Sequence, residues 1–187
     1  CNAEWALKVQ MEELLDQFRL PEKVKRGERI GITAGSRGIK DKPRVLKTII
    51  SRLKDLGASP FIVPCMGSHG NGTAEGQREM LESLGITEKS MGAPIVSSIE
   101  VEEIGRTRFG TPVYADKNMC GADKIIVVNR IKLHTDFKGE IESGVVKMMV
   151  IGMAKPQGAL MVHRLTIKNG FPPVIAEIAP IILKKLP

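Results

Sequence analysis

Apolar and polar positions follow two distinct rhythms along most of the 187-residue chain. Short apolar runs rich in isoleucine and valine have the length and composition of buried strands, and they lie at residues 29–33, 60–64 and 124–129. Longer segments repeat apolar residues every three or four positions and predict helices at 3–19, 43–56, 73–84 and 172–186. Strands alternating with helices are typical of an α/β fold. We expect a Rossmann-like, mostly parallel sheet flanked by helices.

Proline and glycine set the expected ends of these elements. Pro21 is expected to end the first helix, while Pro43 suits the first turn of the second and Gly57 its end. We expect one domain over residues 1–187, with its α/β core at about 28–165.

Weaker patterns fill the rest of the chain. They predict two short strands within 93–105, another strand at 111–115, a turn or short helix at 118–122, a buried helix at 145–153 and a short helix at 156–165.

Three loops directly follow the three predicted strands. Their polar residues are Ser36 and Arg37, then Ser68 and His69, then His134 and Asp136. In an open α/β sheet, ligands bind at the carboxyl ends of the strands. If the strands are parallel neighbours, the three loops form one site; an antiparallel strand among them would break it.

Composition and charge narrow the classes of protein. An apolar content of 42% excludes a disordered chain, and no apolar run reaches the ~20 residues that span a bilayer. Without a signal-peptide pattern at the N-terminus, we expect a soluble, cytoplasmic protein that does not bind membranes. The net charge of +7 is spread along a chain with only 4% aromatics, which argues against nucleic acid and suits a small anion.

The sequence contains no familiar metal or nucleotide motif. Cys1, Cys65 and Cys120 are far apart and form no C-x-x-C pair, so we expect buried or incidental thiols rather than a zinc, iron–sulfur or disulfide framework. The loop AGSRG matches neither the dinucleotide fingerprint nor the Walker A motif.

Two of the three histidines lie in predicted loops. His69, in GSHGNG, suits proton transfer near neutral pH, and a loop histidine bonded to a carbonyl is an equal alternative. His134, two residues before Asp136, is either a second acid/base group or half of a solvated pair.

Three further residues have both a functional and a structural reading. Arg37 is either a fork for a carboxylate or phosphate, or a surface arginine in a turn. Lys147, set in the apolar run VVKMMV, either extends its ammonium to water or is kept near neutrality for covalent chemistry. His163 alone is a poor metal site and would need other ligands, for instance from a bound cofactor.

Several blocks together resemble a known family. IGITAGSRG, VPCMGSHGNGTAEGQ, GTPVYADK, ADKIIVVNRIKLHTDF, ESGVVKMMVIG and MVHR occur in this order. They resemble the N-terminal region of the nickel-dependent lactate racemases and their homologues, over about residues 31–164.

The resemblance implies a nickel-pincer nucleotide, which is a pyridinium mononucleotide whose two sulfur arms hold nickel. Lys147 matches the lysine that tethers this cofactor, and His163, sixteen residues later, matches the nickel ligand. His69 and His134 match the two acid/base histidines, and Arg37 matches an arginine that holds the substrate carboxylate. Ser68, Ser143 and Gly144 are expected to line the cofactor site.

The resemblance therefore implies racemisation or epimerisation of a 2-hydroxy acid, with cofactor-maturation proteins as partners. The alternative is a non-catalytic α/β module that binds a metal or an anion. Ala34 stands where the family has an aspartate, SGVVK replaces a double-glycine form, and the interval from His134 to Lys147 is longer than in the lactate enzymes. The family's C-terminal domain is expected to be absent from these 187 residues.

Overall fold

The computed structural model describes residues 3–130 and 144–187. Within these ranges, β1 (Arg29–Ala34), β2 (Ser59–Pro64) and β5 (Lys124–Ile126) form a parallel sheet in the order β2-β1-β5. The α/β fold with a parallel sheet flanked by helices is confirmed. The three strands that precede the polar loops are indeed parallel neighbours.

Each face of this sheet packs against its own apolar cluster. Ile30, Ile32 and Ile62 lie in the cluster that includes the helices of the first half of the chain. Phe61 and Val63 point to the opposite face and pack with residues from 113 onward. Side chains that alternate between two covered faces explain why the strands read as continuous apolar runs.

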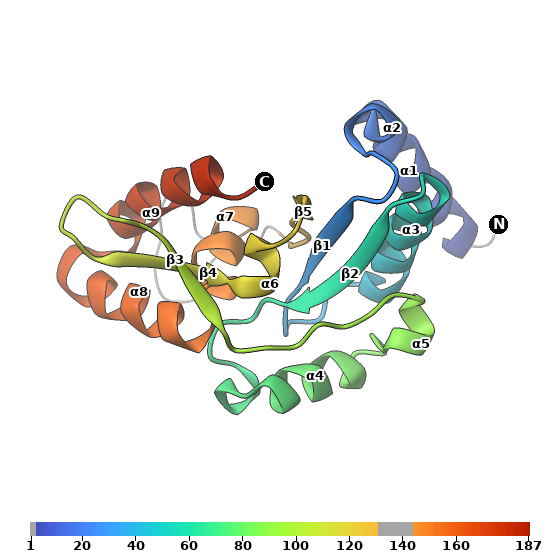
Figure 1. Cartoon of the computed structure of the whole chain (residues 1–187). Coiled ribbons are helices and arrows are strands. Elements are labelled where there is room, and N and C mark those ends of the chain that lie inside the picture. Colours follow the sequence, from blue (N-terminus) through green and yellow to red (C-terminus); the bar gives the residue numbers. More distant parts are fainter. Residues whose placement is uncertain (1–2, 131–143) are drawn as a thin grey trace.

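The helices divide between the two sides of the sheet, as Figure 1 shows. The first group consists of α1 (Ala3–Gln17), α2 (Leu20–Lys23), α3 (Lys42–Asp55), α4 (Ala74–Ser83) and α5 (Glu88–Met91). The second group consists of α6 (Lys117–Cys120), α7 (Val145–Lys147), α8 (Lys155–Asn169) and α9 (Phe171–Lys185). The amphipathic helices α3, α4 and α9 confirm the predicted segments to within a few residues.

An antiparallel hairpin lies beside the parallel sheet. It pairs β3 (Val101–Arg106) with β4 (Pro112–Asp116) and has a bulge between Glu103 and Gly105. The other short strand expected near residue 95 makes only an isolated parallel bridge, between Ile95 and Ile62.

Three sequence predictions need correction. The first helix ends at Gln17, and Pro21 lies in the first turn of a separate short helix, where its missing N–H costs nothing. The strand expected at 124–129 is assigned only to 124–126. The run 145–153 is not one regular α-helix, since a π-helical turn, Met148–Gly152, follows α7.

Among the described residues, no single helix is both long enough and apolar enough to cross a membrane. One pair of segments, 145–152 and 155–169, passes the test together by length and composition but is bent by 106°.

The loop after β2 is held tightly against the start of α4. Gly70 has φ +65°, and a Cβ added there would lie 2.5 Å from the carbonyl carbon of Gly76. Thr73 caps α4 through its hydroxyl, which accepts a hydrogen bond from the Gly76 amide at 3.0 Å. The glycines of GSHGNG therefore serve close packing as well as conformational freedom.

We predict that Gly70→Ala destabilises the fold by about 2–4 kcal/mol, since it adds a backbone clash to left-handed strain. Gly85→Ala is the matched control: Gly85 also has positive φ, at +77°, but its Cβ would meet nothing within 4 Å. It should cost only about 1–2 kcal/mol. Urea unfolding monitored by circular dichroism measures both, and equal losses would show that the contact with α4 is unimportant.

Candidate functional site

The loops after β1 and β2 meet at the edge where the two strands end, here called the carboxyl edge. The strands run in register to their last residues, Ala34 opposite Pro64. Two residues beyond Ala34, the Ser36 hydroxyl lies 2.6 Å from Nδ1 of His69. Parallel pairing thus joins two polar residues that are 33 positions apart in the chain.

The environment of His69 favours the neutral imidazole. The side chain is on an exposed loop, but neighbouring atoms desolvate it in part, and this is the main reason why its pKa lies below the usual 6.5. The positive charges of Arg37 and Lys147 lower the pKa of His69 further. Arg37 and Lys147 are thus close enough to His69 to interact with it electrostatically, although the three predicted site residues belong to three separate motif blocks.

The side chain of Lys42 holds the loop that carries Ser36 and Arg37 through hydrogen bonds to its backbone. Lys42 is 2% exposed, and its ammonium donates to the carbonyls of Gly35 and Arg37. Burial lowers the pKa of Lys42 to about 8. The ammonium of Lys42 is therefore fixed to the backbone of the loop. Arg37 accepts this bond with its backbone carbonyl, and the residue as a whole is exposed.

The loop that carries Ser68 and His69 has a comparable support. Gln77, which is fully buried, donates from Nε2 to the carbonyls of Gly67 at 2.8 Å and His69 at 3.3 Å. Its Oε1 accepts a hydrogen bond from the buried ammonium of Lys155 at 3.2 Å. Ser68 is exposed on the same loop.

The segment that begins at Gly144 reaches the same edge. The side-chain amide of Asn129, just beyond β5, donates to the Gly144 carbonyl at 2.8 Å. Gly144 is buried and has φ +85°, a conformation that suits glycine. In the π-helical turn that follows α7, the Gly152 carbonyl accepts a hydrogen bond from the Gly67 amide at 3.2 Å. This segment therefore packs directly on the loop that carries His69.

Lys147 ends α7 and is partly buried. Its ammonium lies 5.4 Å from the centroid of the Phe171 ring, a cation–π contact. Its amine also stands close enough to His69 to lower the pKa of that imidazole. The two readings of Lys147 both remain predictions.

His163 occupies an exposed position on α8. In the part of the chain that the structure describes, no three His, Cys, Asp or Glu side chains gather as a metal site. His163 would therefore hold a metal only together with donors supplied by another group. His134, Asp136 and Ser143 lie outside the described residues.

Two other predictions about individual residues are resolved. Ala34 is fully buried at the end of β1, so at this position the chain offers packing instead of a polar contact. Cys65 and Cys120 are free thiols, and burial raises their pKa values to about 12 and about 11. Both thiols are therefore protonated at neutral pH, which agrees with the interpretation that they are incidental. Cys1 lies outside the described residues.

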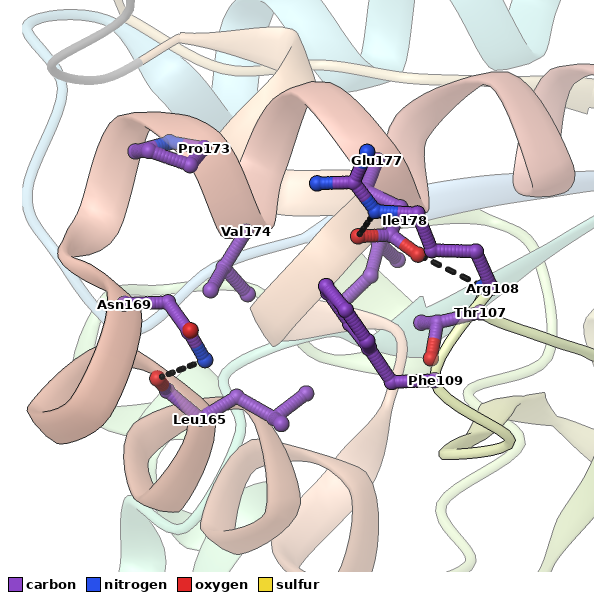
Figure 2. Close-up of a pocket in the computed structure, with 9 residues that line it drawn as sticks. All are labelled: Thr107, Arg108, Phe109, Leu165, Asn169, Pro173, Val174, Glu177 and Ile178. Carbon is purple, nitrogen blue, oxygen red and sulfur yellow. Dashed lines mark hydrogen bonds and ion pairs between the residues drawn. The ribbon is translucent and has the colours of Figure 1, made fainter.

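Two hollows lined by described residues lie away from the carboxyl edge. Figure 2 shows one of about 130 Å³ between the β3–β4 turn and helices α8 and α9. Arg108 there is bonded to Glu177 through its backbone amide at 2.7 Å and paired with it through Nε at 3.5 Å. A second, apolar hollow of about 240 Å³ lies between β5 and the end of α9. Both are smaller than the roughly 300–1,000 Å³ of typical ligand pockets.

Sequence reasoning missed the buried supports of the two loops, which are Lys42, Gln77, Asp116 and Lys155. A signal for two of them was present: the dipeptide Lys-Pro begins both α3 and α8. Proline favours the first turn of a helix, but a cation there is opposed by the helix dipole. A lysine at the first position of a helix therefore needs a specific partner. The ammonium groups of Lys42 and Lys155 both donate hydrogen bonds to backbone carbonyls.

Comparison with known proteins gives one clear match. A family model described as the lactate racemase N-terminal domain matches residues 2–171. No curated protein matches the chain.

The electrostatics of the carboxyl edge predict that Arg37→Gln and Lys147→Met each raise the pKa of His69 toward 6.5, the first more than the second. Lys168→Met, at the exposed end of α8, is the control and should leave it unchanged. The measurement is an NMR titration of the imidazole Cε1–H signals. If neither site variant moves the His69 signal, the three groups do not interact.

The lowered pKa of His69 also makes the stability of the fold depend on pH. Because folding lowers the pKa of His69, the folded state disfavours the proton, and this group's contribution to stability is complete above the unfolded pKa of about 6.5. It is lost as the pH falls through the folded pKa.

Proposed function

The chain belongs to the lactate racemase N-terminal domain family, and from this premise we propose that it is the cofactor-binding part of a nickel-dependent racemase or epimerase of a 2-hydroxy acid. One observation carries the proposal beyond the family match. Arg37, His69 and Lys147 come from three separate motif blocks, yet the two cations lie close enough to His69 to lower its pKa.

The residue types suit the chemistry of a 2-hydroxy acid. Its α C–H is a weak acid, so removing a proton from carbon is difficult, whereas removing the hydroxyl proton needs only a base near neutral pKa. A nickel-pincer nucleotide, when bound, supplies an acceptor for the hydrogen of that C–H as hydride. The protein is left with binding, orientation and proton transfer.

His69 is proposed to exchange the hydroxyl proton. As a base, the imidazole carries its proton on Nδ1 and donates it to the Ser36 hydroxyl oxygen, which lies 2.6 Å away. Nε2 is then the nitrogen that faces the substrate. Since the pKa of His69 lies below 6.5, its imidazole is mostly unprotonated at neutral pH and ready to accept. His134 is proposed to do the same from the opposite side, which racemisation requires.

The remaining residues are proposed to bind. Arg37 offers a guanidinium fork to the carboxylate of the substrate. Lys147 is proposed as the covalent tether of the cofactor and His163 as the protein ligand of nickel. Ser68, Ser143 and Gly144 are proposed to line the cofactor site.

The described part of the chain fits such a group. The segment from Gly144 to Gly152 packs against the loop that carries His69, so a cofactor attached at Lys147 would lie near the proposed base. The described residues offer no metal site of their own. A metal whose other donors come from the cofactor is consistent with a single histidine ligand. The cations of the carboxyl edge suit both a phosphate and a carboxylate.

The tether is tested by mass spectrometry of the complete natural protein, co-produced with the cofactor-maturation proteins. The wild type should carry added mass on Lys147 and about one nickel per chain. Lys147→Ala should carry neither, and His163→Ala should keep the added mass but lose nickel. Lys168→Ala, an exposed lysine of α8, should match the wild type. Unmodified Lys147 in the wild type would refute the proposal.

The reaction is tested by incubating the loaded protein with a panel of enantiopure 2-hydroxy acids and following optical rotation. His69→Ala should lose at least about 100-fold in kcat, because a general base contributes roughly that much. Its secondary structure and nickel content should be unchanged. A wild type that holds nickel but turns over none of the acids would favour the non-catalytic module.

A further inference from the structure

A chain of buried polar groups runs beneath His69 and ends at its backbone. We propose that Lys155 and Gln77 are positioning residues, which fix the loop Gly67–His69 so that the imidazole is held in place. The importance of this for turnover rests on the proposed function of His69. The positioning itself does not, because it concerns the geometry of the loop.

Lys155 stands at the centre of this chain. It is fully buried, and its ammonium donates to the carbonyl of Pro64, the last residue of β2, and to Oε1 of Gln77 at 3.2 Å. It also forms an ion pair with Asp116, whose Oδ2 lies 3.3 Å from Nζ. The ammonium thus joins β2, α4, α8 and the end of β4 at one point.

Asp116 is fixed independently of the lysine. It is fully buried, and its Oδ1 caps α6 by accepting hydrogen bonds from the amides of Asn118 at 2.8 Å and Met119 at 3.0 Å. Oδ2 accepts no hydrogen bond from the described residues and is left facing Lys155. The carboxylate therefore holds the charge of Lys155 in a fixed direction.

The lysine determines which way the Gln77 amide faces. An ammonium can only donate hydrogen bonds, so it must meet the oxygen of that amide and not the nitrogen. Nε2 is then directed at the carbonyls of Gly67, 2.8 Å away, and His69, 3.3 Å away. The orientation set by a buried charge is in this way transmitted to the backbone of the loop.

Placing Lys155 here costs free energy of folding through backbone strain and through the helix dipole. This cost argues that the position of its ammonium is useful for another reason. Lys155 has φ +56°, a left-handed conformation that strains a residue with a Cβ, and its charge lies at the unfavourable end of α8. Buried ion pairs are often no more stabilising than apolar residues of the same size, but they fix orientation. A role in stability alone would not require the hydrogen bonds that Gln77 makes to the loop.

The test uses Gln77→Glu and Lys155→Met in the 187-residue chain. Glutamate keeps an acceptor for Lys155 but has no N–H to donate, so both bonds to the loop are lost. Hydrogen exchange by NMR should accelerate at least about tenfold at the amides of His69 and Gly72, which donate to the carbonyls of Met66 and His69 and so depend on how this loop is held. The exchange of amides between β1 and β2 should change little. Lys168→Met is the matched lysine control.

Selective acceleration in the loop supports the proposal. Unchanged exchange at both amides overturns it, and so does an equal acceleration throughout the chain, which would indicate a general loss of stability. Should Lys155→Met fail to fold, Gln77→Glu still decides, since it keeps the buried charge pair.

Turnover gives a second and separate readout. In the loaded protein, Gln77→Glu should lower kcat about 100-fold, the effect expected of a 1 Å misplacement, with KM nearly unchanged. If the wild type shows no turnover, the proposed function fails while the exchange experiment stands. If Gln77→Glu loosens the loop but leaves kcat intact, the positioning role in catalysis is refuted.

Discussion

The in-register parallel pairing of β1 and β2 is the constraint on which the site depends. The two strands start at Arg29 and Ser59 and end together at Ala34 and Pro64, so the loops that follow leave the sheet at the same level. A shift by a single residue would turn every side chain to the other face. It would exchange the two apolar clusters and separate Ser36 from His69.

This pairing explains why the general form of the site was predictable from sequence. Apolar runs such as Arg29–Thr33 indicate buried parallel strands, and parallel neighbours bring their following loops together. The contact between Ser36 and His69 is a direct consequence. Helices with a clear apolar stripe, such as α3, were also predictable because burial of that stripe determines where they lie.

Other features depend on contacts that no local pattern contains. Lys155 and Gln77 meet across 78 positions. The Lys-Pro start of α8 indicates that the lysine needs a partner, but nothing in KPQG or AEGQ identifies Gln77 as that partner. The β3–β4 hairpin escaped prediction as a pair because its bulge at Glu103–Gly105 breaks the alternation of apolar and polar residues. The short extent of β5 likewise reflects its tertiary surroundings more than the apolar run that contains it.

Two buried lysines and two cations close to His69 have different electrostatic roles. Lys42 and Lys155 are satisfied by backbone carbonyls and by Asp116, so their charges stabilise loops. Arg37 and Lys147, by contrast, lie close enough to His69 to lower its pKa. In the loaded protein the proposed tether would use the Lys147 amine, so the charge left beside His69 is that of Arg37. A carboxylate bound to Arg37 would offset this charge, and the pKa of His69 would then rise. Occupancy by a carboxylate would thus strengthen the base at the moment when its hydroxyl proton must be taken, which couples binding of the acid to proton transfer.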